Sequence, residues 1–397
     1  MELLLCFLLG AGLGTFAGLI PGVHVNNLTP LVPALVVSAG LSPLGGAAAI
    51  VTMAVVQTFT SYIPSTFLGV PEEGTALSVL PTHRMVLEGR GPVALRLTTS
   101  GCLWGLFLGS LLALPLAAVF GGIYGLLRPA MGWILLAVVA LMILSEGSPR
   151  RMAWSLLVFL LSGALGLLTL DLGGEVLMPL LSGLFGMSVV LESLASRERL
   201  PEQREEEGEP PVPLPPLLSG VGAGVFTGFL PGIGPAEGTV LSQLVTRTRR
   251  TEDFLLSVSG VNMVKVLFSF VALHAIGRPR SGAAVAVGEL LEVGRGELLF
   301  LVGVALLAGA LSSLLVPALA RLVCSGLPRL PYRALGLSTL LLILSLTLLL
   351  CGPAGLPLLL TATAIGLLPG RVGVRRSHGM GVILLPCTLY FLGLRSL

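Results

Sequence analysis

Residues Gly10-Ala-Gly-Leu-Gly-Thr-Phe-Ala-Gly-Leu-Ile-Pro-Gly22 form a glycine-rich segment that ends in a Pro-Gly pair. The same pattern returns as Gly220-Val-Gly-Ala-Gly-Val-Phe-Thr-Gly-Phe-Leu-Pro-Gly232, aligned without a gap at an offset of 210 residues. The positions that recur unchanged are Gly10, Gly12, Gly14, Phe16, Gly18, Pro21 and Gly22. A segment repeated in this way within one chain indicates an internal duplication.

Two further elements repeat in the same order. The turn Gly69-Val-Pro-Glu-Glu-Gly74 corresponds to Gly277-Arg-Pro-Arg-Ser-Gly282, and Gly89-Arg-Gly91 corresponds to Gly294-Arg-Gly296. Three repeated elements in one order favour a duplication over a coincidence of glycine-rich sequence.

A charged, proline-rich stretch separates the two repeats. Residues 196–216 alternate arginine with glutamate and end in Pro-Pro-Val-Pro-Leu-Pro-Pro, a composition typical of a solvated linker. The sequence therefore predicts a first transmembrane repeat at residues 1–195, a cytoplasmic linker at residues 196–216 and a second transmembrane repeat at residues 217–397.

The composition indicates that the chain lies in a lipid bilayer. Hydrophobic residues make up 54% of the 397 residues and charged residues only 11%, against roughly 25% charged residues in a soluble domain. The mean hydropathy is +0.97, and the apolar runs cover nearly the whole length. These values exclude a water-soluble protein and predict a multi-pass protein of the plasma membrane. The scattered charges also exclude the continuous basic face that nucleic-acid binding requires.

Apolar runs predict ten helical spans. They lie near residues 45–68, 93–120, 129–146, 152–170, 175–194, 254–276, 298–320, 334–352, 354–369 and 379–395. The runs on either side of the second Pro-Gly pair are too short for two full crossings, since each crossing needs about 20 residues, and a re-entrant helical hairpin fits them better. The predicted fold is an all-α polytopic membrane protein with two inverted-topology repeats, each a re-entrant helical hairpin plus about five transmembrane helices.

The arginines predict the orientation of the two repeats. The positive-inside rule places on the cytoplasmic side Arg84, Arg90, Arg96, Arg150, Arg151, Arg321, Arg329, Arg333, Arg371, Arg375 and Arg376. It places Glu289, Glu292 and Glu297 outside. Gly89-Arg-Gly91 then faces the cytoplasm whereas Gly294-Arg-Gly296 faces out, so the repeats are inverted and both termini lie outside.

The Pro-Gly pairs are predicted to form the tips of the hairpins and to bind the substrate. Proline ends the incoming helix, glycine permits a positive φ, and the amides that open the returning helix form a partly positive end suited to an anion. Two tips, Pro21-Gly22 and Pro231-Gly232, would meet near the midplane, as in many secondary transporters. For Gly10, Gly12 and Gly14 the alternative is that they only allow close helix packing.

Polar residues follow both tips. His24, Asn26 and Asn27 follow the first tip, and Glu237 and Thr239 follow the second. We expect His24, Asn26, Asn27 and Thr239 to contribute to substrate binding. A carboxylate in a membrane segment is costly unless it functions or is paired, so Glu237 is a candidate coupler of a proton or sodium ion. The alternative for Glu237 is simple solvation near the opening of the hairpin.

Lys265 is the single lysine of the chain and lies inside the apolar segment 261–271. A point ammonium beside a hairpin tip would neutralise an anionic substrate. Its repeat partner is Gln57, so one repeat would offer a charge and the other a neutral hydrogen-bonding group. The alternative is a helix-end lysine paired with Glu252 or Asp253.

The turn that carries Glu72 and Glu73 is the third candidate element of the site. These carboxylates are candidates for ion coupling along the substrate path, whereas the repeated turn carries Arg278 and Arg280 instead. The alternative is that both turns are ordinary loops at the membrane interface.

With these motifs the chain resembles the large membrane permease of tripartite tricarboxylate transporters, and especially its shorter archaeal relatives. The resemblance rests on the two glycine-rich segments that end at Gly22 and Gly232 and on the Gly-x-Pro turns at Gly69 and Gly277. It implies uptake of di- or tricarboxylates driven by an ion gradient. It also implies an extracytoplasmic binding protein and a small membrane subunit as partners.

The Pro-Gly hairpins are also similar to those of polyprenyl-phosphate translocases, which return a lipid carrier across the membrane. A phosphate head group would suit the same helix ends and Lys265. A lipid carrier needs a cleft open to the bilayer, whereas a soluble acid needs a sealed, water-filled vestibule. We therefore keep a lipid-carrier translocase as the alternative function.

Other function classes have little support in the sequence. The chain has two aspartates, four histidines without metal-like spacing, and five scattered cysteines, so neither a metal site nor a catalytic motif is predicted. We expect no enzyme activity and no cofactor beyond a coupling H⁺ or Na⁺. A channel is disfavoured because duplicated broken helices are typical of alternating access.

Overall fold

The computed structural model describes residues 1–20, 25–29, 31–70, 74–172, 176–195, 201, 203–204, 208, 211–230, 234–246, 250–326 and 332–395. All the described elements are helical, which confirms the predicted all-α fold. The helices of the first half are α1 (Glu2–Leu19), α2 (Val25–Leu28), α3 (Leu31–Ser38), α4 (Pro43–Thr60), α5 (Tyr62–Phe67), α6 (Val79–Leu87), α7 (Gly91–Leu127), α8 (Met131–Leu144), α9 (Pro149–Thr169), α10 (Leu177–Leu181) and α11 (Ser188–Ala195). Those of the second half are α12 (Leu214–Phe229), α13 (Pro235–Thr246), α14 (Thr251–Ile276), α15 (Gly282–Leu290), α16 (Arg295–Gly326), α17 (Tyr332–Cys351), α18 (Gly355–Val372) and α19 (Gly381–Phe391). Short helical segments, η1 (Arg128–Ala130), η2 (Leu170–Leu172), η3 (Ser182–Met187) and η5 (Arg376–Met380), adjoin them.

Seven helical stretches of the described chain are long and apolar enough to cross a membrane. They are Glu2–Leu19, Pro43–Phe67, Gly91–Leu144, Pro149–Leu172, Thr251–Ile276, Arg295–Cys324 and Gly355–Val372. Three shorter apolar helices cover Leu177–Glu192, Leu214–Phe229 and Gly336–Cys351. These stretches confirm a polytopic membrane protein. The predicted span at residues 379–395 is shorter than expected, because its α-helix covers only Gly381–Phe391.

The segment predicted as a linker ends earlier than expected, because α12 begins at Leu214. Proline occupies the first turn of this helix, where it is tolerated since an N–H at that position has no intrahelical acceptor. The end of the proline run therefore starts a helix instead of preceding one.

The described linker residues contact the first half of the chain. The side-chain oxygen of Gln203 accepts a hydrogen bond from the N–H of Gly91 at 3.0 Å, and its nitrogen donates to the carbonyl oxygen of Val86 at 3.0 Å. The N–H of Arg204 donates to the carbonyl oxygen of Gly89 at 2.8 Å. The linker and the turn between α6 and α7 thus lie at the same end of the molecule.

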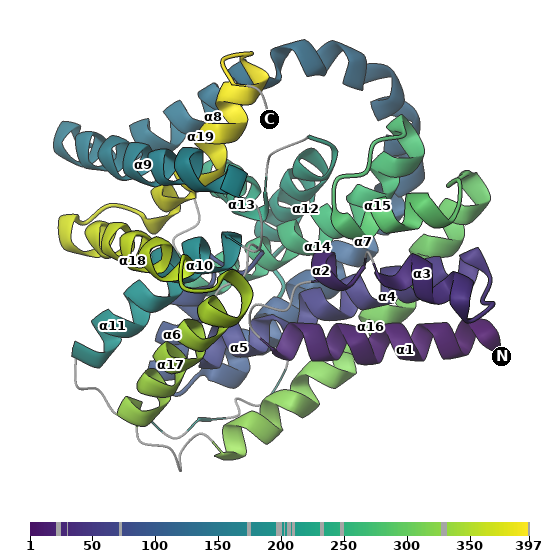
Figure 1. Ribbon diagram of the computed structural model, residues 1–397, viewed down its shortest axis with the longest axis horizontal. Coiled ribbons are helices and arrows are strands. Elements are labelled where there is room, and N and C mark those ends of the chain that lie inside the picture. The colour runs from purple at the N-terminus through teal and green to yellow at the C-terminus, as the bar shows by residue number, and fades with distance from the viewer. Residues whose placement is uncertain are drawn as a thin grey trace.

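The helices form two lobes, each built from both halves of the chain (Figure 1). The first lobe contains α1–α5, α7, α12 and α14–α16, and its apolar core joins residues between Ala11 and Ala117 to residues between Leu217 and Ala320. The second lobe contains α8–α11 and α17–α19, and its main core joins residues between Met131 and Phe185 to residues between Ala362 and Leu384. Both halves of the chain therefore contribute helices to each hydrophobic core.

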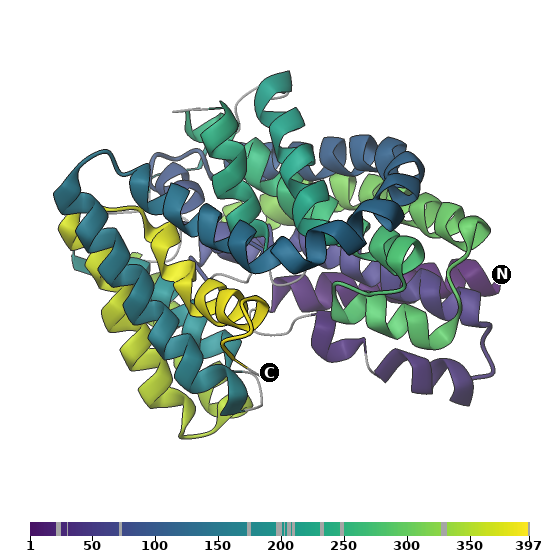
Figure 2. The same ribbon diagram turned by 90° about the horizontal axis from the view of Figure 1, so that it is seen from above.

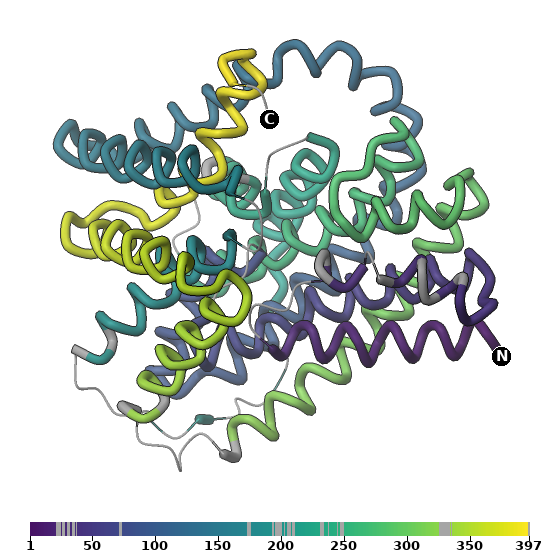
Figure 3. Tube along the Cα trace, in the orientation of Figure 1, coloured from purple at the N-terminus to yellow at the C-terminus, as the bar shows by residue number. Residues whose placement is uncertain are grey.

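The separation into two lobes is also visible after rotation (Figure 2), with α13 between them. The tube trace places the purple N-terminal helix in the first lobe and the yellow C-terminal helix in the second (Figure 3). The core of the second lobe also includes Ala236 and Val240 of α13 and Leu230 at the end of α12. The end of α12 and the first part of α13 therefore lie where the lobes meet.

Two glycine stripes bring helices of the first lobe into backbone contact. On α1, Gly14 lies so close to α4 that a Cβ atom there would be 2.6 Å from the carbonyl oxygen of Met53, and Gly10 faces Ala49 in the same way. On α12, a Cβ atom at Gly220 would be 2.7 Å from the carbonyl oxygen of Ser257. The packing role considered for Gly10 and Gly14 is thus confirmed.

Gly12 does not share this packing role. A Cβ atom at Gly12 or at Gly222 would meet no described atom within 4 Å. Both glycines lie two residues from the contacting ones, and a half-turn of helix points them away from the neighbouring helix.

Candidate functional site

Helix α12 ends a little beyond the middle of α14, whereas α1 runs beside the whole of α4 and ends near the C-terminus of that helix. Gly228 lies near the end of α12, and a Cβ atom there would be 3.4 Å from the carbonyl oxygen of Lys265. Gly18 lies near the end of α1, and a Cβ atom there would be 2.9 Å from the carbonyl oxygen of Gln57. Lys265 is the fifteenth residue of α14, which starts at Thr251, so it lies about 21 Å along this helix at 1.5 Å per residue. The structure therefore places Gln57 and Lys265 beside the ends of the two glycine-rich helices.

Helix α13 returns from this depth toward the start of α12. Near the tip, a Cβ atom at Gly238 would be 2.8 Å from side-chain carbons of Thr227 and Val261. At the far end, the hydroxyl of Ser242 lies 2.6 Å from that of Ser219 on α12 and 2.5 Å from that of Ser257 on α14. α13 is thus antiparallel to α12, and its N-terminus lies at the depth of Lys265.

Several predicted site residues lie outside the described residues. These are Pro21, Gly22, His24, Glu72, Glu73, Pro231 and Gly232. Asn26 and Asn27 belong to α2 and Glu237 belongs to α13, but their side chains are not among those described. Their predicted roles remain predictions.

Of the predicted site residues that are described, Gln57 and Thr239 are buried and Lys265 is half-buried. The hydroxyl of Thr239 donates to the carbonyl oxygen of Pro235, one turn earlier in α13, at 2.7 Å. This is the side-chain bond to the carbonyl one turn earlier that a threonine in a helix commonly makes, and it leaves the hydroxyl oxygen with acceptor capacity.

Arg280, in the turn before α15, contacts the end of α12. It was not predicted as a site residue. Its Nε donates to the carbonyl oxygen of Phe229 at 3.0 Å, and its guanidinium lies 5.1 Å from the centre of the Tyr124 ring. Its Nη2 atom is buried without a hydrogen-bond partner among the described residues. The sequence signal was its place in the repeated Gly-x-Pro turn, where it corresponds to Glu72.

Gly74 and Ser281, the described residues that follow the two Gly-x-Pro motifs, both contact the middle of α14. Gly74 packs directly against the side-chain amide of the buried Asn262, three residues before Lys265. The hydroxyl of Ser281 lies 2.9 Å from that of Ser269, one turn after Lys265. Gly74 and Ser281 therefore lie beside the part of α14 where α12 ends.

The charges at this depth favour an anion. The backbone of Lys265, the guanidinium group of Arg280 and the partly positive N-terminus of α13 lie around the end of α12. Backbone amides at a helix N-terminus bind anions, and cations beside them strengthen that preference. On the first half, the corresponding helix end lies beside the neutral Gln57.

A second polar region lies at the end of the molecule where the linker docks. Arg90 bonds to Glu252 at 3.1 Å, and Arg96 donates to the carbonyl oxygen of Gly208 in the linker at 3.0 Å. A pocket of about 570 Å³ opens at this end and is lined by Leu77, Leu80, Pro81, Glu192, Gln243, Arg250, Thr251, Phe254, Pro369, Gly370, Gly373, Val374, Arg375, Arg376 and Ser377. We call this end, where the described arginines predicted to be cytoplasmic gather, the arginine end.

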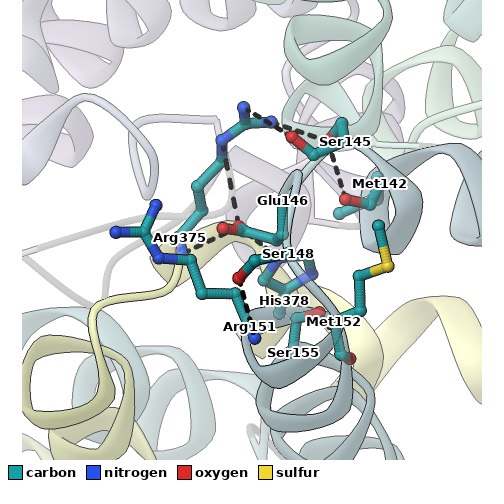
Figure 4. A network of polar contacts seen from close by, with 9 residues as sticks. All are labelled: Met142, Ser145, Glu146, Ser148, Arg151, Met152, Ser155, Arg375 and His378. Carbon is teal, nitrogen blue, oxygen red and sulfur yellow. Dashed lines mark hydrogen bonds and ion pairs between the residues drawn. The ribbon is translucent and has the colours of Figure 1, made fainter.

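A buried carboxylate joins two segments of the second lobe near this pocket (Figure 4). Oε1 of Glu146 lies 2.9 Å from Nε2 of His378 and accepts a hydrogen bond from the N–H of Arg375 at 3.1 Å. Burial lowers the pKa of His378 below its usual value of 6.5, while Glu146 partly opposes this shift. Neither residue was singled out as a site residue, because nothing local in the sequence pairs positions so far apart.

Seven candidate membrane spans in the described chain define an integral membrane protein. The sequence model of the Tripartite tricarboxylate transporter TctA family matches residues 4–381. The chain belongs to this family, which comprises transporters and not enzymes. The resemblance inferred from the Pro-Gly motifs is thereby confirmed.

A relative from an archaeon matches almost end to end. An uncharacterized protein of Methanocaldococcus jannaschii is 27% identical over 409 residues, which cover 98% of this chain and 99% of that protein. No solved structure matches the chain.

Proposed function

We propose that this permease is a secondary active transporter of a small di- or tricarboxylate, and that it works by alternating access with ion coupling. The observation that carries the proposal is the meeting of Lys265, Arg280 and the N-terminus of α13 at the end of α12. The buried Nη2 atom of Arg280 has no hydrogen-bond partner among the described residues, so it can donate to a bound anion. A polycarboxylate is an anion that several such groups can share.

Alternating access requires two comparable halves, and the helix pattern supports an inverted duplication. The contact of Gly14 with Met53 corresponds to that of Gly224 with Val261, where a Cβ atom would be 2.9 Å from the carbonyl oxygen. The glycine-rich helix of each half therefore packs in parallel on the long helix that follows it. In the second half, α12 ends part-way along α14, as the first arm of a re-entrant hairpin would.

Helices α7 and α16, which follow corresponding turns in the two halves, run antiparallel to each other. One pocket is lined by Pro92 and Arg96 together with Arg321, whereas another is lined by Pro115 together with Arg295. The start of each helix therefore lies beside the end of the other. An inverted repeat predicts this arrangement, because it relates equivalent helices by a two-fold axis in the membrane plane.

The proposed binding step uses the two helix ends differently. Lys265 and Arg280 neutralise the carboxylates, while Gln57 on the other half hydrogen-bonds the substrate without adding charge. The Pro-Gly tips, with His24, Asn26, Asn27 and Thr239, complete the site. Ion coupling is assigned to Glu237, Glu72 and Glu73, because a carboxylate near a dianion binds a proton or sodium ion more readily.

The proposal extends to the partners that the family name implies. We infer that an extracytoplasmic binding protein delivers the substrate and that a small membrane subunit accompanies this chain. The exposed apolar face of α1, with Leu4, Leu8 and Phe16 all more than half exposed, offers surface for lipid or for such a subunit.

Uptake by reconstituted vesicles tests the proposal. Radiolabelled citrate and succinate should accumulate under a proton or sodium gradient, and Lys265→Gln should abolish this uptake while the thermal melt stays near that of the wild type. Lys265→Arg is the matched control, since it keeps the charge and should retain part of the uptake. Unchanged uptake by Lys265→Gln would remove Lys265 from the site.

The same preparation separates the carboxylate from the alternative lipid-phosphate substrate. A thermal-shift screen compares citrate and succinate with a short-chain polyprenyl phosphate, because a ligand that binds the folded state raises its melting temperature. Stabilisation by the polyprenyl phosphate alone would favour a lipid-carrier translocase over a carboxylate transporter.

A further inference from the structure

The pocket at the arginine end lies between the two lobes. Leu77 and Leu80 from around α6, Gln243 of α13 and Phe254 of α14 form one wall, and residues of the α18–η5 segment with Glu192 of α11 form the other. Its volume of about 570 Å³ falls within the range of about 300–1,000 Å³ that small-molecule sites occupy. The pocket is therefore large enough for a small polycarboxylate.

The charge of the pocket is positive. Arg250, Arg375 and Arg376 line it, against one acidic residue, Glu192. Ser377, Thr251 and Gln243 add polar groups at its wall, while Phe254 and the leucines supply apolar surface. Apolar walls with a few convergent polar groups are typical of a small-molecule site.

One carboxylate already occupies this pocket, that of Glu192. Its Oε2 lies 2.5 Å from Nη2 of Arg376, whose Nη1 donates to the carbonyl oxygen of Gly366 at 2.9 Å and to the hydroxyl of Ser188 at 3.1 Å. The side chain of Arg376 is 12% exposed and that of Glu192 is 38% exposed. The guanidinium is thus held rigidly by neutral partners, and its carboxylate partner is the more accessible member of the pair.

The position of the pocket relates it to the mid-depth site. Arg250, Thr251 and Phe254 precede or begin α14, the helix that carries Lys265. Phe254 and Lys265 are eleven residues apart, about 16 Å along the helix. The pocket therefore lies at the arginine end, on the same helix as Lys265 and about three turns of that helix away from it.

We propose that this pocket is a second binding site for the transported carboxylate, at which the substrate displaces Glu192 from Arg376. The inference rests on the proposed function only in taking the anion to be the transported one. Arg250 neutralises a further carboxylate of the substrate, whereas the guanidinium of Arg375 is held by Ser145 beside Glu146. Glu192 then limits the affinity, so that the anion is released from the pocket instead of being retained.

The proposal makes opposite predictions for two charges of the same pocket. Citrate binding is measured by isothermal titration calorimetry on purified Lys265→Gln protein, in which the mid-depth site is disabled. Adding Glu192→Gln should tighten binding about fivefold, because the internal competitor loses its charge, and adding Arg250→Gln should weaken it about fivefold. Melting curves of each variant show that the fold is retained.

Two matched controls remove the same charges elsewhere at this end. Glu88, in the exposed pair with Arg84 at 3.3 Å, lies outside the pocket, and so does the exposed Arg321, which lines a different pocket with Arg96. Glu88→Gln and Arg321→Gln should leave citrate binding within about twofold, since exposed charges at a distance are screened by salt. Equal effects of Glu192→Gln and Glu88→Gln would overturn the proposal, and so would the absence of citrate binding in the Lys265→Gln protein.

Inorganic phosphate serves as a second probe, because it represents a lipid head group without its chains. Binding of phosphate but not of citrate would overturn the assignment of the pocket to a carboxylate. Failure of the wild type to take up citrate into vesicles, with binding to this pocket intact, would instead contradict the proposed function and leave the pocket assignment standing.

Discussion

The Nε2 atom of His378 lies 2.9 Å from Oε1 of Glu146, although 232 residues separate the two in the sequence. Both side chains are at most 5% exposed. The contact joins the turn between α8 and α9 to the 3-10 segment before α19. One buried carboxylate thus connects the first and second halves of the chain within the second lobe.

This pair predicts a loss of stability in mild acid. Burial lowers the pKa of His378 in the folded protein, whereas the unfolded histidine keeps a pKa near 6.5. Below about pH 6.5 the unfolded state therefore binds more protons, so the free energy of unfolding falls as the pH decreases toward the lower folded pKa. We expect a lower melting temperature at pH 5.5 than at pH 7.5, and a smaller difference in His378→Gln.

The matched control for this experiment is His274→Gln. The imidazole of His274 contacts the carbonyl oxygen of Val293 at 2.7 Å, on the first lobe. This variant should keep the pH-dependent difference in melting temperature. An equal pH dependence in wild type and His378→Gln would show that His378 is not the group responsible.

The glycine stripes predict a contrast between neighbouring positions of one helix. Gly14→Ala would place a Cβ atom 2.6 Å from the carbonyl oxygen of Met53, so we expect a destabilisation of about 1–3 kcal/mol. Gly12→Ala should be neutral or slightly stabilising, because alanine is the better helix former. Melting temperatures of the two variants in detergent check this, and Gly224→Ala against Gly222→Ala repeats the test on α12.

Local patterns in the sequence were sufficient for the helices and for the packing of Gly10 and Gly14. Hydropathy over about 20 residues and glycine spacing of four are local signals, and they predict spans and close helix contacts directly. Clustering of arginines between apolar runs likewise predicted which arginines share one end. The resemblance to the family rested on equally local Pro-Gly and Gly-x-Pro motifs.

Contacts between distant segments could not be predicted in this way. The sequence shows neither that both halves contribute to each lobe nor that His378 pairs with Glu146, because each depends on how separate helices pack. Arg280 was visible as part of a repeated turn, but its bond to the carbonyl oxygen of Phe229, 51 residues earlier, depends on the path of the chain after α14. The pocket at the arginine end also combines segments from both halves.

Arg280 should be required for substrate affinity, whereas Arg278 should not. Arg280 binds the end of α12 beside the proposed site, and Arg278 is exposed two residues earlier in the same turn. We expect Arg280→Gln to raise the KM for citrate uptake about tenfold, which corresponds to about 1.4 kcal/mol. Arg280→Lys should recover part of this affinity because it restores the positive charge.

The control for this prediction is Arg278→Gln, which removes the same charge from the same turn and should leave the KM unchanged. Since Arg280 also pairs with a helix-end carbonyl, melting temperatures are measured for every variant. A lower melting temperature with an unchanged KM would show that Arg280 only stabilises the end of α12.

The inverted repeat predicts that Arg90 and Arg295 face opposite sides of the membrane. Arg90 precedes α7 and bonds to Glu252 at the arginine end, whereas Arg295 begins α16 and lines a pocket with Leu114 near the other end of α7. Single cysteines at these positions, in a chain whose native cysteines are replaced by alanine, report the side through a membrane-impermeant maleimide. Arg295→Cys should react in intact cells, and Arg90→Cys only after permeabilisation. Reaction of both from the same side would contradict the inversion and with it the alternating-access proposal.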